Sequence, residues 1–193
     1  LHTDFREGWD IKRLADEMEI DGRDILTTYI CKRCFKYQVK SYDGPDQHCK
    51  HCGAQSSTNT ISVTLGITEK YLNEIYNLMD VYCHPFTSGG QEIPIQEAKF
   101  AGLPTLVTNY SCGEEMCSKE AHSFPLDWCE YREFGTNFIK ASTCPKSIAK
   151  QLKKVYQMSP ERRQLLGVKA RDWALENFSI KNLGKKLEKF LDS

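Results

Sequence analysis

Two pairs of cysteines constrain the fold of this 193-residue chain more than any other feature of its sequence. Cys31 and Cys34 form the first pair, Cys49 and Cys52 form the second, and 14 residues separate the pairs. Each pair can place two thiolates on one tight turn, and four thiolates complete the tetrahedral shell of a structural zinc ion. The alternatives are two disulfides or unliganded thiols. We predict a zinc ribbon over residues 31–53, inserted into a larger domain.

Basic, aromatic and imidazole side chains surround the cysteine pairs. His48 and His51 flank the second pair, and we expect them to be bystanders because the four cysteines already form a complete ligand set. The remaining side chains could contact nucleic acid or could form the solvated surface of a small ribbon. They are Lys32, Arg33, Lys36, Tyr37, Lys40 and Tyr42.

Charge balance and cysteine count narrow the classes of function. Lys and Arg number 26 against 26 Asp and Glu, so no global field attracts a polyanion, and a nucleic-acid partner is not expected. The chain has no apolar run of about 18 residues, so we expect no membrane span. The nine cysteines are an odd number and five of them are scattered, which favours a reducing compartment; we expect a cytoplasmic protein.

Hydrophobic periodicity predicts strands that alternate with helices. In chain order the expected elements are a helix at residues 10–19, strands at 25–30 and 60–65, a helix capped by Thr68, a strand at 80–86, a helix that starts near Pro94 and a strand at 104–108. This alternation predicts an α/β fold, with a parallel sheet covered by helices on both faces. From Cys144 onward only helices are expected, and they form a helical C-terminal tail.

A glycine turn between a predicted strand and a predicted helix is the most informative stretch for function. Ser88, Gly89 and Gly90 follow the strand at residues 80–86, and Pro94 lies in the first turn of the helix. At a helix N-terminus the unpaired N–H groups and the helix dipole favour an anion such as a diphosphate. Ligands of open parallel sheets bind beyond the carboxyl ends of the strands, which is where we expect this loop.

The order of residues in this stretch resembles the retaining GT-B glycosyltransferases (glycosyl transferases group 1, family 4-like). Their C-terminal, donor-binding domains carry a Pro-Ser-x-x-Glu-Gly-Phe-Gly-x-Pro-x-x-Glu-Ala motif followed by Gly-x-Pro. The matching residues are Pro85, Gly90, Pro94, Glu97, Ala98, Gly102 and Pro104. The resemblance extends from Gly66 to Ser179 and covers most of the chain outside the cysteine-rich insertion. It implies that residues 1–193 form the Rossmann-like, nucleotide-sugar-binding half of a GT-B fold.

The resemblance also implies roles for single residues. Glu97 stands at the position whose glutamate faces the ribose hydroxyls of the donor. Gly89 stands where the family has a second glutamate that contacts the transferred sugar. Glu92 could supply this carboxylate, backbone N–H groups could replace it, or activity could be altered or lost. The candidate catalytic residues are Glu92 and Glu97, and the candidate donor-binding residues are Ser88, Gly89, Gly90, Gln91, Glu97, Ser111 and Gly113.

Two functions are therefore expected. The first is transfer of a hexosyl or related sugar from a nucleotide-diphospho-sugar to an acceptor that is held by an N-terminal domain upstream of Leu1. On this interpretation the chain is a fragment of a longer enzyme and transfers no sugar alone. The second is a zinc-ribbon interaction module on a catalytically inactive Rossmann-like scaffold, which binds protein or nucleic acid.

Overall fold

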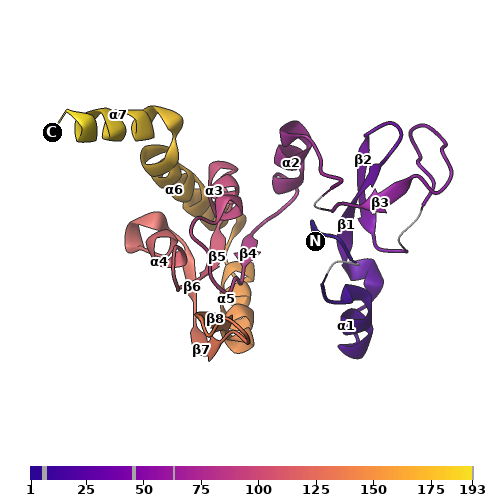
Figure 1. The fold of residues 1–193 in the computed structure, drawn as a ribbon, viewed down its shortest axis with the longest axis horizontal. Coiled ribbons are helices and arrows are strands. Elements are labelled where there is room, and N and C mark those ends of the chain that lie inside the picture. Colours follow the sequence, from indigo (N-terminus) through magenta and orange to yellow (C-terminus); the bar gives the residue numbers. More distant parts are fainter. Residues whose placement is uncertain (6–7, 45–46, 63, 193) are drawn as a thin grey trace. The chain divides into compact units, whose positions relative to one another are not determined.

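An antiparallel sheet organises the first of the two units into which the chain divides, Leu1–Asn73 and Glu74–Ser193. The computed structural model describes residues 1–5, 8–44, 47–62 and 64–192. The first unit contains α1 (Ile11–Glu17), η1 (Gly22–Asp24), β1 (Leu26–Cys31), β2 (Tyr37–Ser41) and β3 (Thr58–Thr60), and α2 (Glu69–Tyr76) spans the boundary (Figure 1).

The strand predicted at residues 25–30 exists as β1, but its partners differ from the prediction. β1 is the central strand of an antiparallel sheet with the order β2-β1-β3, in which Tyr29 faces Gln38 and Cys31 faces Thr58. Tyr29 and Ile30 are buried, as expected for a central strand rich in β-branched and aromatic residues. The segment 31–53 therefore contains β2 and forms part of this antiparallel sheet, and the described pairings of β1 are antiparallel and not parallel.

The strand predicted at residues 60–65 is wrong in position. β3 ends at Thr60, and the backbones of Ser62 and Leu65 then form an isolated antiparallel bridge with each other. β3 extends to Thr58 because the chain after the second cysteine pair returns beside β1, and this long-range pairing leaves no mark on the local apolar pattern. Val63, which belongs to the predicted strand, lies outside the described residues.

The second unit is built on a parallel sheet. Its elements are β4 (Tyr82–His84), α3 (Ile93–Phe100), β5 (Thr105–Thr108), α4 (Gly113–Met116), η2 (Lys119–Ala121), β6 (Phe124–Leu126), β7 (Trp128–Arg132), β8 (Ile139–Thr143), α5 (Pro145–Tyr156), α6 (Pro160–Phe178) and α7 (Ile180–Leu191) (Figure 1). Within the described residues, the parallel sheet has the strand order β4-β5-β6. The strands expected at residues 80–86 and 104–108 are thus confirmed as β4 and β5.

Helices cover both faces of this parallel sheet, as the sequence predicted. Neighbouring residues of β5 point to opposite faces, so Val107 packs with Ile95 of α3 and Met116 of α4, whereas Leu106 packs with Val155 of α5. The carboxyl ends of β4 and β5 lead into the loops before α3 and α4. Loops that follow parallel strands in this way share one edge of the sheet.

A β-hairpin that the sequence analysis did not predict borders this edge. β7 and β8 pair antiparallel, and the amide of Ala141 in β8 donates to the carbonyl of Thr87 at 2.8 Å. A hydroxyl contact of 2.7 Å between Thr108 and Thr143 adds a second link. Most of β7 is exposed, so its sequence lacks the clear alternation of apolar and polar residues that marks a half-buried strand.

The helical C-terminal tail is confirmed by α5, α6 and α7. Ser159 and Ser179 begin α6 and α7, and each side chain accepts a hydrogen bond from the backbone N–H three residues later. None of the described residues of α7 is buried. Among the helices that the structure describes, none combines the length and the apolar character needed to cross a bilayer.

Candidate functional site

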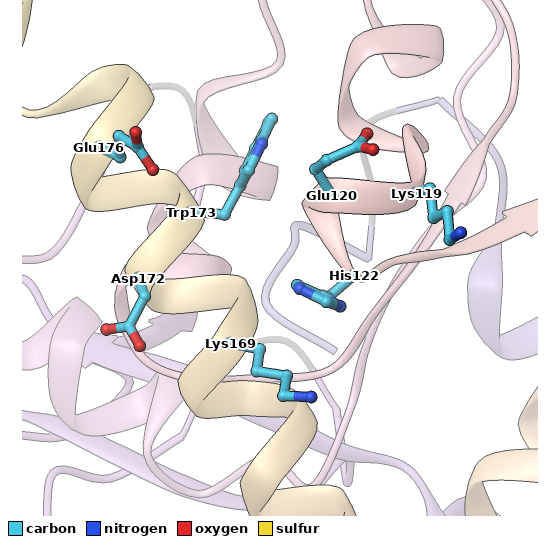
Figure 2. Close-up of a pocket in the computed structure, with 7 residues that line it drawn as sticks. All are labelled: Lys119, Glu120, His122, Lys169, Asp172, Trp173 and Glu176. Atoms are coloured by element: carbon cyan, nitrogen blue, oxygen red, sulfur yellow. The ribbon is translucent and has the colours of Figure 1, made fainter.

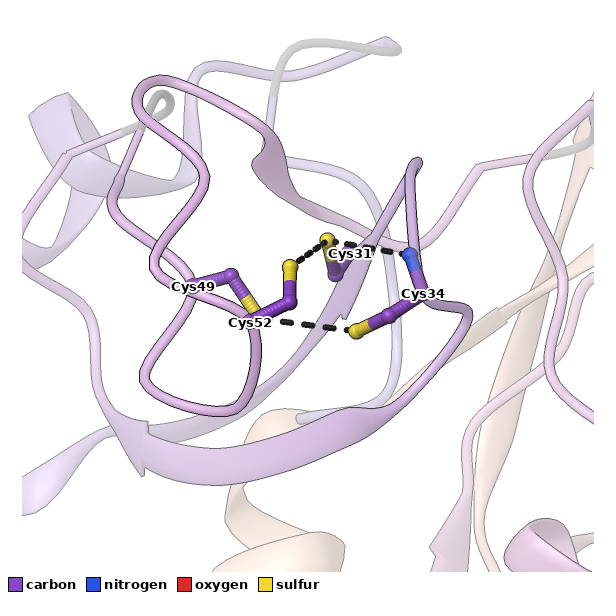
Figure 3. Close-up of side chains that lie close together, drawn as sticks. All are labelled: Cys31, Cys34, Cys49 and Cys52. Atoms are coloured by element: carbon purple, nitrogen blue, oxygen red, sulfur yellow. Dashed lines mark hydrogen bonds between the residues drawn. The ribbon is translucent and has the colours of Figure 1, made fainter.

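The four predicted metal ligands lie together in the first unit. Their Sγ atoms all fall within 4.8 Å of one another. Figure 3 shows the contacts across the two pairs, 3.8 Å between the Sγ atoms of Cys31 and Cys52 and 3.6 Å between those of Cys34 and Cys49. Cys31 ends β1 and is buried together with Cys49, while Cys52 is exposed.

The sulfur geometry fits a tetrahedral metal ion and not a disulfide. Zn–S bonds of about 2.3 Å in a tetrahedron separate the sulfurs by about 3.8 Å, close to both measured distances. A disulfide requires about 2.05 Å. All nine cysteines are free, so the alternative of two disulfides is not present in this structure. The donor set therefore suits a metal such as zinc.

Backbone amides point at the sulfurs, which favours the thiolate form that binds a metal. The amides of Arg33 and Cys34 donate to Sγ of Cys31 at 3.3 and 3.5 Å, and the amide of His51 donates to Sγ of Cys49 at 3.4 Å. Burial opposes ionisation of Cys31, but hydrogen bonds from Ser57 and these amides outweigh it and lower the pKa of Cys31 to about 6. Within the metal-free cluster the pKa of Cys49 is also lowered, whereas that of Cys34 is raised to about 11, because hydrogen bonds between the clustered thiols favour its protonated form.

Several side chains around the cysteines have partners within the first unit. The ring of Tyr37 packs on Tyr71 with centroids 4.6 Å apart, and Tyr42 stacks on Phe5 at 4.0 Å. Lys40 pairs with a carboxylate oxygen of Asp43 at 2.9 Å. These packed rings and this paired ammonium are less available for nucleic acid than their sequence pattern suggested. In the described residues the possible metal-ligand group consists of the four cysteines, without His48 or His51.

The glycine loop lies at the carboxyl end of β4, where the sequence placed it. Residues 88–91 lie within the loop 85–92 that connects β4 to α3, and Ser88, Gly90 and Gln91 are exposed. The residue before α3, Glu92, makes no side-chain cap to the helix, but the amides of Ile93 and Ile95 donate to the carbonyls of Gln91 and Glu92, each at 3.1 Å, and Pro94 has no N–H. The exposed loop residues Ser88, Gly90 and Gln91, and not the first turn of α3, are therefore what this edge offers to an external anion.

A hydrogen bond joins the predicted loop residues of neighbouring strands. The hydroxyl of Ser111, which follows β5, donates to the carbonyl of Gly89 at 2.8 Å. Gly113 is buried, and a Cβ at this position would overlap the carbonyl oxygen of Thr108 and lie 2.9 Å from Cζ of Phe86. Gly113 is therefore required by packing, and its N–H donates to the carbonyl of Tyr110 at 3.0 Å.

Both predicted carboxylates of α3 are held by hydrogen bonds. The Tyr76 hydroxyl donates to Oε2 of Glu97 at 3.0 Å. Burial, and then the neighbouring Tyr82 and Glu97, raise the pKa of Tyr76 far above that of an exposed tyrosine, so the hydroxyl remains a donor. Oε2 of Glu92 lies 2.9 Å from Nε2 of His84, at the end of β4.

Sequence reasoning missed the aromatic residues that support these carboxylates. Tyr82 and His84 are two residues apart on β4 and therefore share one face of the strand. Their side chains meet at 3.0 Å between the Tyr82 hydroxyl and Nδ1 of His84. The ring of Tyr82 also packs edge-on against Tyr76, with centroids 5.7 Å apart. The period-two spacing of Tyr82 and His84 was the available signal.

A pocket elsewhere in the second unit contains none of the predicted residues. It has a volume of about 480 Å³ between η2 and α6 (Figure 2). Its lining residues are Lys119, Glu120, His122, Lys169, Asp172, Trp173 and Glu176. Acidic and basic groups are mixed around the indole ring, which gives no net positive charge to attract a diphosphate. The candidate ligand site therefore remains at the glycine loop.

Comparisons of this chain with models of protein families, with curated proteins and with solved structures found no match.

Proposed function

We propose that the second unit is the donor-binding part of a glycosyltransferase and binds a nucleotide-diphospho-sugar at residues 88–91. One observation carries this proposal: the glycine loop at the carboxyl end of β4 enters α3 without a side-chain cap, and Ser111 of the next loop is bonded to it at 2.8 Å. Two neighbouring loops at one edge of a parallel sheet form a typical site for a phosphate-containing ligand.

The chemistry follows from the charges around this loop. The diphosphate accepts hydrogen bonds from backbone N–H groups of residues 88–91, and Glu97 accepts hydrogen bonds from the ribose hydroxyls. In the transfer, the bond between the sugar C1 and the diphosphate oxygen breaks, a bond forms from C1 to the acceptor oxygen, and the acceptor hydroxyl loses its proton. Stabilisation of the departing diphosphate by the backbone N–H groups of this loop lowers the barrier. We propose, by resemblance, a Rossmann-like GT-B half and a retaining reaction whose acceptor is held by another domain.

We further propose that the four cysteines bind one zinc ion with a structural role. A closed shell of four thiolates leaves no position for water or substrate, so this ion supplies folding free energy and no chemistry. The donor set and the sulfur distances of 3.6 and 3.8 Å support zinc.

A second candidate function belongs to the first unit. Lys32, Arg33, Phe35 and Lys36 are exposed around the first cysteine pair. Three cationic side chains beside an exposed aromatic ring suit an acidic partner such as nucleic acid. In this alternative the second unit is an inactive scaffold.

Titration of nucleoside diphosphates into the full chain separates the two candidates. Uridine, guanosine and adenosine diphosphates are added in turn while backbone amide shifts are followed. We expect shifts at residues 88–91 and in the first turn of α3 with at least one of them. Glu97→Gln removes the charge from an acceptor, and loss of a charged hydrogen bond costs about 1.5–3 kcal/mol, so binding weakens roughly ten- to a hundredfold.

Glu188→Gln is the matched control, because Glu188 is an exposed carboxylate on α7. It is expected to leave the affinity unchanged. Tyr76→Phe tests the support of Glu97 without changing its charge and is expected to weaken binding less than Glu97→Gln. If no diphosphate shifts the loop, or if the shifts cluster at Cys31–Cys52, the donor-binding proposal fails.

A further inference from the structure

Glu92 is held in one place by a hydrogen-bond chain that starts on β4. The Tyr82 hydroxyl contacts Nδ1 of His84 at 3.0 Å, and Nε2 of His84 contacts Oε2 of Glu92 at 2.9 Å. The His84 and Glu92 side chains are only 20% and 21% exposed, so water competes weakly for this contact. Glu92 precedes α3 but makes no side-chain cap to it, so its carboxylate is turned away from the helix and toward β4.

Gly89 provides the space that this carboxylate fills. A Cβ built on Gly89 would overlap Oε1 of Glu92 and would lie 3.0 Å from its Cδ. The backbone of Gly89 is not among the left-handed conformations of this chain, so any residue could adopt it. A side chain at position 89 would therefore displace the Glu92 carboxylate from the place that it occupies beside Gly89.

We propose that Oε1 of Glu92, above Gly89, accepts hydrogen bonds from hydroxyls of the sugar of a nucleotide-diphospho-sugar, and that His84 is the residue that positions it. This inference rests on the proposed donor site. A carboxylate repels a diphosphate, so Glu92 must face a part of the ligand that offers hydrogen-bond donors. The ligand has hydroxyls at its ribose and at its sugar, and Glu97 occupies the ribose end.

The two carboxylates are far enough apart to serve the two ends. Glu92 precedes α3 and Glu97 lies within it, five positions later, which corresponds to about 7.5 Å at the rise of a helix. Each has a fixed partner on one oxygen, His84 for Glu92 and Tyr76 for Glu97. The contact from His84 orients Glu92 and offsets its repulsion from the nearby diphosphate, which a freely rotating glutamate would not achieve.

The test compares each nucleoside diphosphate with its sugar derivative, for example uridine diphosphate with its glucose conjugate and guanosine diphosphate with its mannose conjugate. The measured quantity is the ratio of the two dissociation constants. Glu92→Gln is expected to lower the affinity for the sugar derivative about tenfold and to leave that for the bare diphosphate within about twofold, because only the sugar loses a charged acceptor. Glu97→Gln is expected to weaken both ligands equally.

His84 is tested by two variants. His84→Phe removes the donor and is expected to raise the dissociation constant of the sugar derivative, relative to that of the bare diphosphate, as far as Glu92→Gln does. His84→Gln places an amide N–H near the position of Nε2 and is expected to restore part of the ratio. If His84 had a purely structural role, both variants would weaken the binding of the two ligands alike. That result would overturn the positioning role.

A variant pair checks the geometry without any ligand. Gly89→Ala forces the Glu92 side chain aside and is expected to lower the urea midpoint of the full chain. In a Glu92→Ala background the new methyl group at position 89 has room, so the same substitution is expected to lower the midpoint little. Equal effects in both backgrounds would contradict the shared space. If bare diphosphates bind as proposed but Glu92→Gln leaves the sugar ratio unchanged, this inference alone fails; if no diphosphate binds, the donor-site proposal fails.

Discussion

Lys99 is the charged side chain that this fold buries most completely. It lies on α3 with no exposed surface, and its Nζ donates to the carbonyl of Ala121 and to the hydroxyl of Ser123, each at 2.6 Å. The ammonium also lies over the ring of Trp173, 5.1 Å from its centroid. Burial lowers the pKa of Lys99 to about 8, because no carboxylate replaces the lost water. These two hydrogen bonds link α3 to the segment before β6.

Stability is expected to rise with pH because of Lys99. Its pKa is about 8 in the folded chain and 10.5 in an exposed lysine, so between these values the unfolded chain binds more protons. The full cost of burying the charge, about 3 kcal/mol, is present below pH 8 and disappears as the pH approaches 10.5. Urea unfolding across this range measures the rise.

Lys99→Met is the comparison that isolates this effect. Methionine fills a similar volume without a titrating group, so the variant is expected to lack the rise that Lys99 produces. Free thiols also titrate in this range, but they contribute to both proteins and cancel in the difference. Identical pH profiles for the two proteins would show that Lys99 stays protonated in the folded chain.

At the level of elements, two glycines set how closely α6 approaches the end of α3. Gly102 follows α3 with a left-handed φ of 77°, and its carbonyl oxygen lies against Gly167 of α6. A Cβ on Gly167 would overlap that oxygen and lie 2.8 Å from its carbon. Because the obstacle is backbone, no side-chain rotation relieves it.

Gly167→Ala is expected to destabilise the chain by about 1–2 kcal/mol. Overpacking against backbone typically costs about 1–3 kcal/mol, and the better helix propensity of alanine offsets about 1 kcal/mol of this. Gly184→Ala in α7 is the control, since a Cβ there meets nothing within 4 Å, and it should stabilise the chain by up to about 1 kcal/mol. Thermal unfolding of both variants measures the contrast, and a stabilised Gly167→Ala would refute the close contact.

The elements that the sequence predicted are those that local patterns specify. Buried strands such as β5 and capped helices such as α6 carry their own signals. The pairing of β1 with β3 and the hairpin of β7 and β8 depend on partners that local periodicity does not reveal. The same holds for the candidate sites. The cysteine ligands were predictable because their spacing is local, whereas the contact between Glu97 and Tyr76 joins residues 21 positions apart and was not.

Across the whole molecule, the two units derive their stability from different sources. The second unit has an apolar cluster on each face of its parallel sheet, one around Val107 and the other around Leu106. The first unit has the four-cysteine cluster within a small antiparallel sheet. Units of this size often need a metal or disulfides in addition to their core. Removal of a bound metal should therefore affect the two units unequally.

Protein prepared without chelator is expected to contain about one zinc ion per chain, and a strong chelator is expected to unfold the first unit alone. Tetrathiolate zinc contributes on the order of 10 kcal/mol to folding. Metal analysis gives the content, and backbone amide spectra should lose the dispersed signals of β1, β2 and β3 while those of β4, β5 and β6 persist.

Cys49→Ser and Cys129→Ser form a matched pair for this measurement. The first removes a cluster sulfur and should abolish stoichiometric zinc, whereas Cys129 is an exposed thiol on β7 and its loss should leave the zinc content unchanged. Metal-free protein with all signals of the first unit intact would contradict the structural role of the ion.

Because Gly89 and Glu92 share one space, substitutions at these two positions are expected to be coupled in evolution. A side chain larger than hydrogen at position 89 overlaps the Glu92 carboxylate, so such a residue displaces that carboxylate while Glu92 stays. Descendants of this chain should keep glycine and glutamate together or replace both. A lineage that acquires a carboxylate at position 89 should lose the one at position 92. The intermediate sequence then carries either both carboxylates, which overlap, or neither of them. We therefore expect both intermediates to function less well than either arrangement, so that each lineage keeps the arrangement it has.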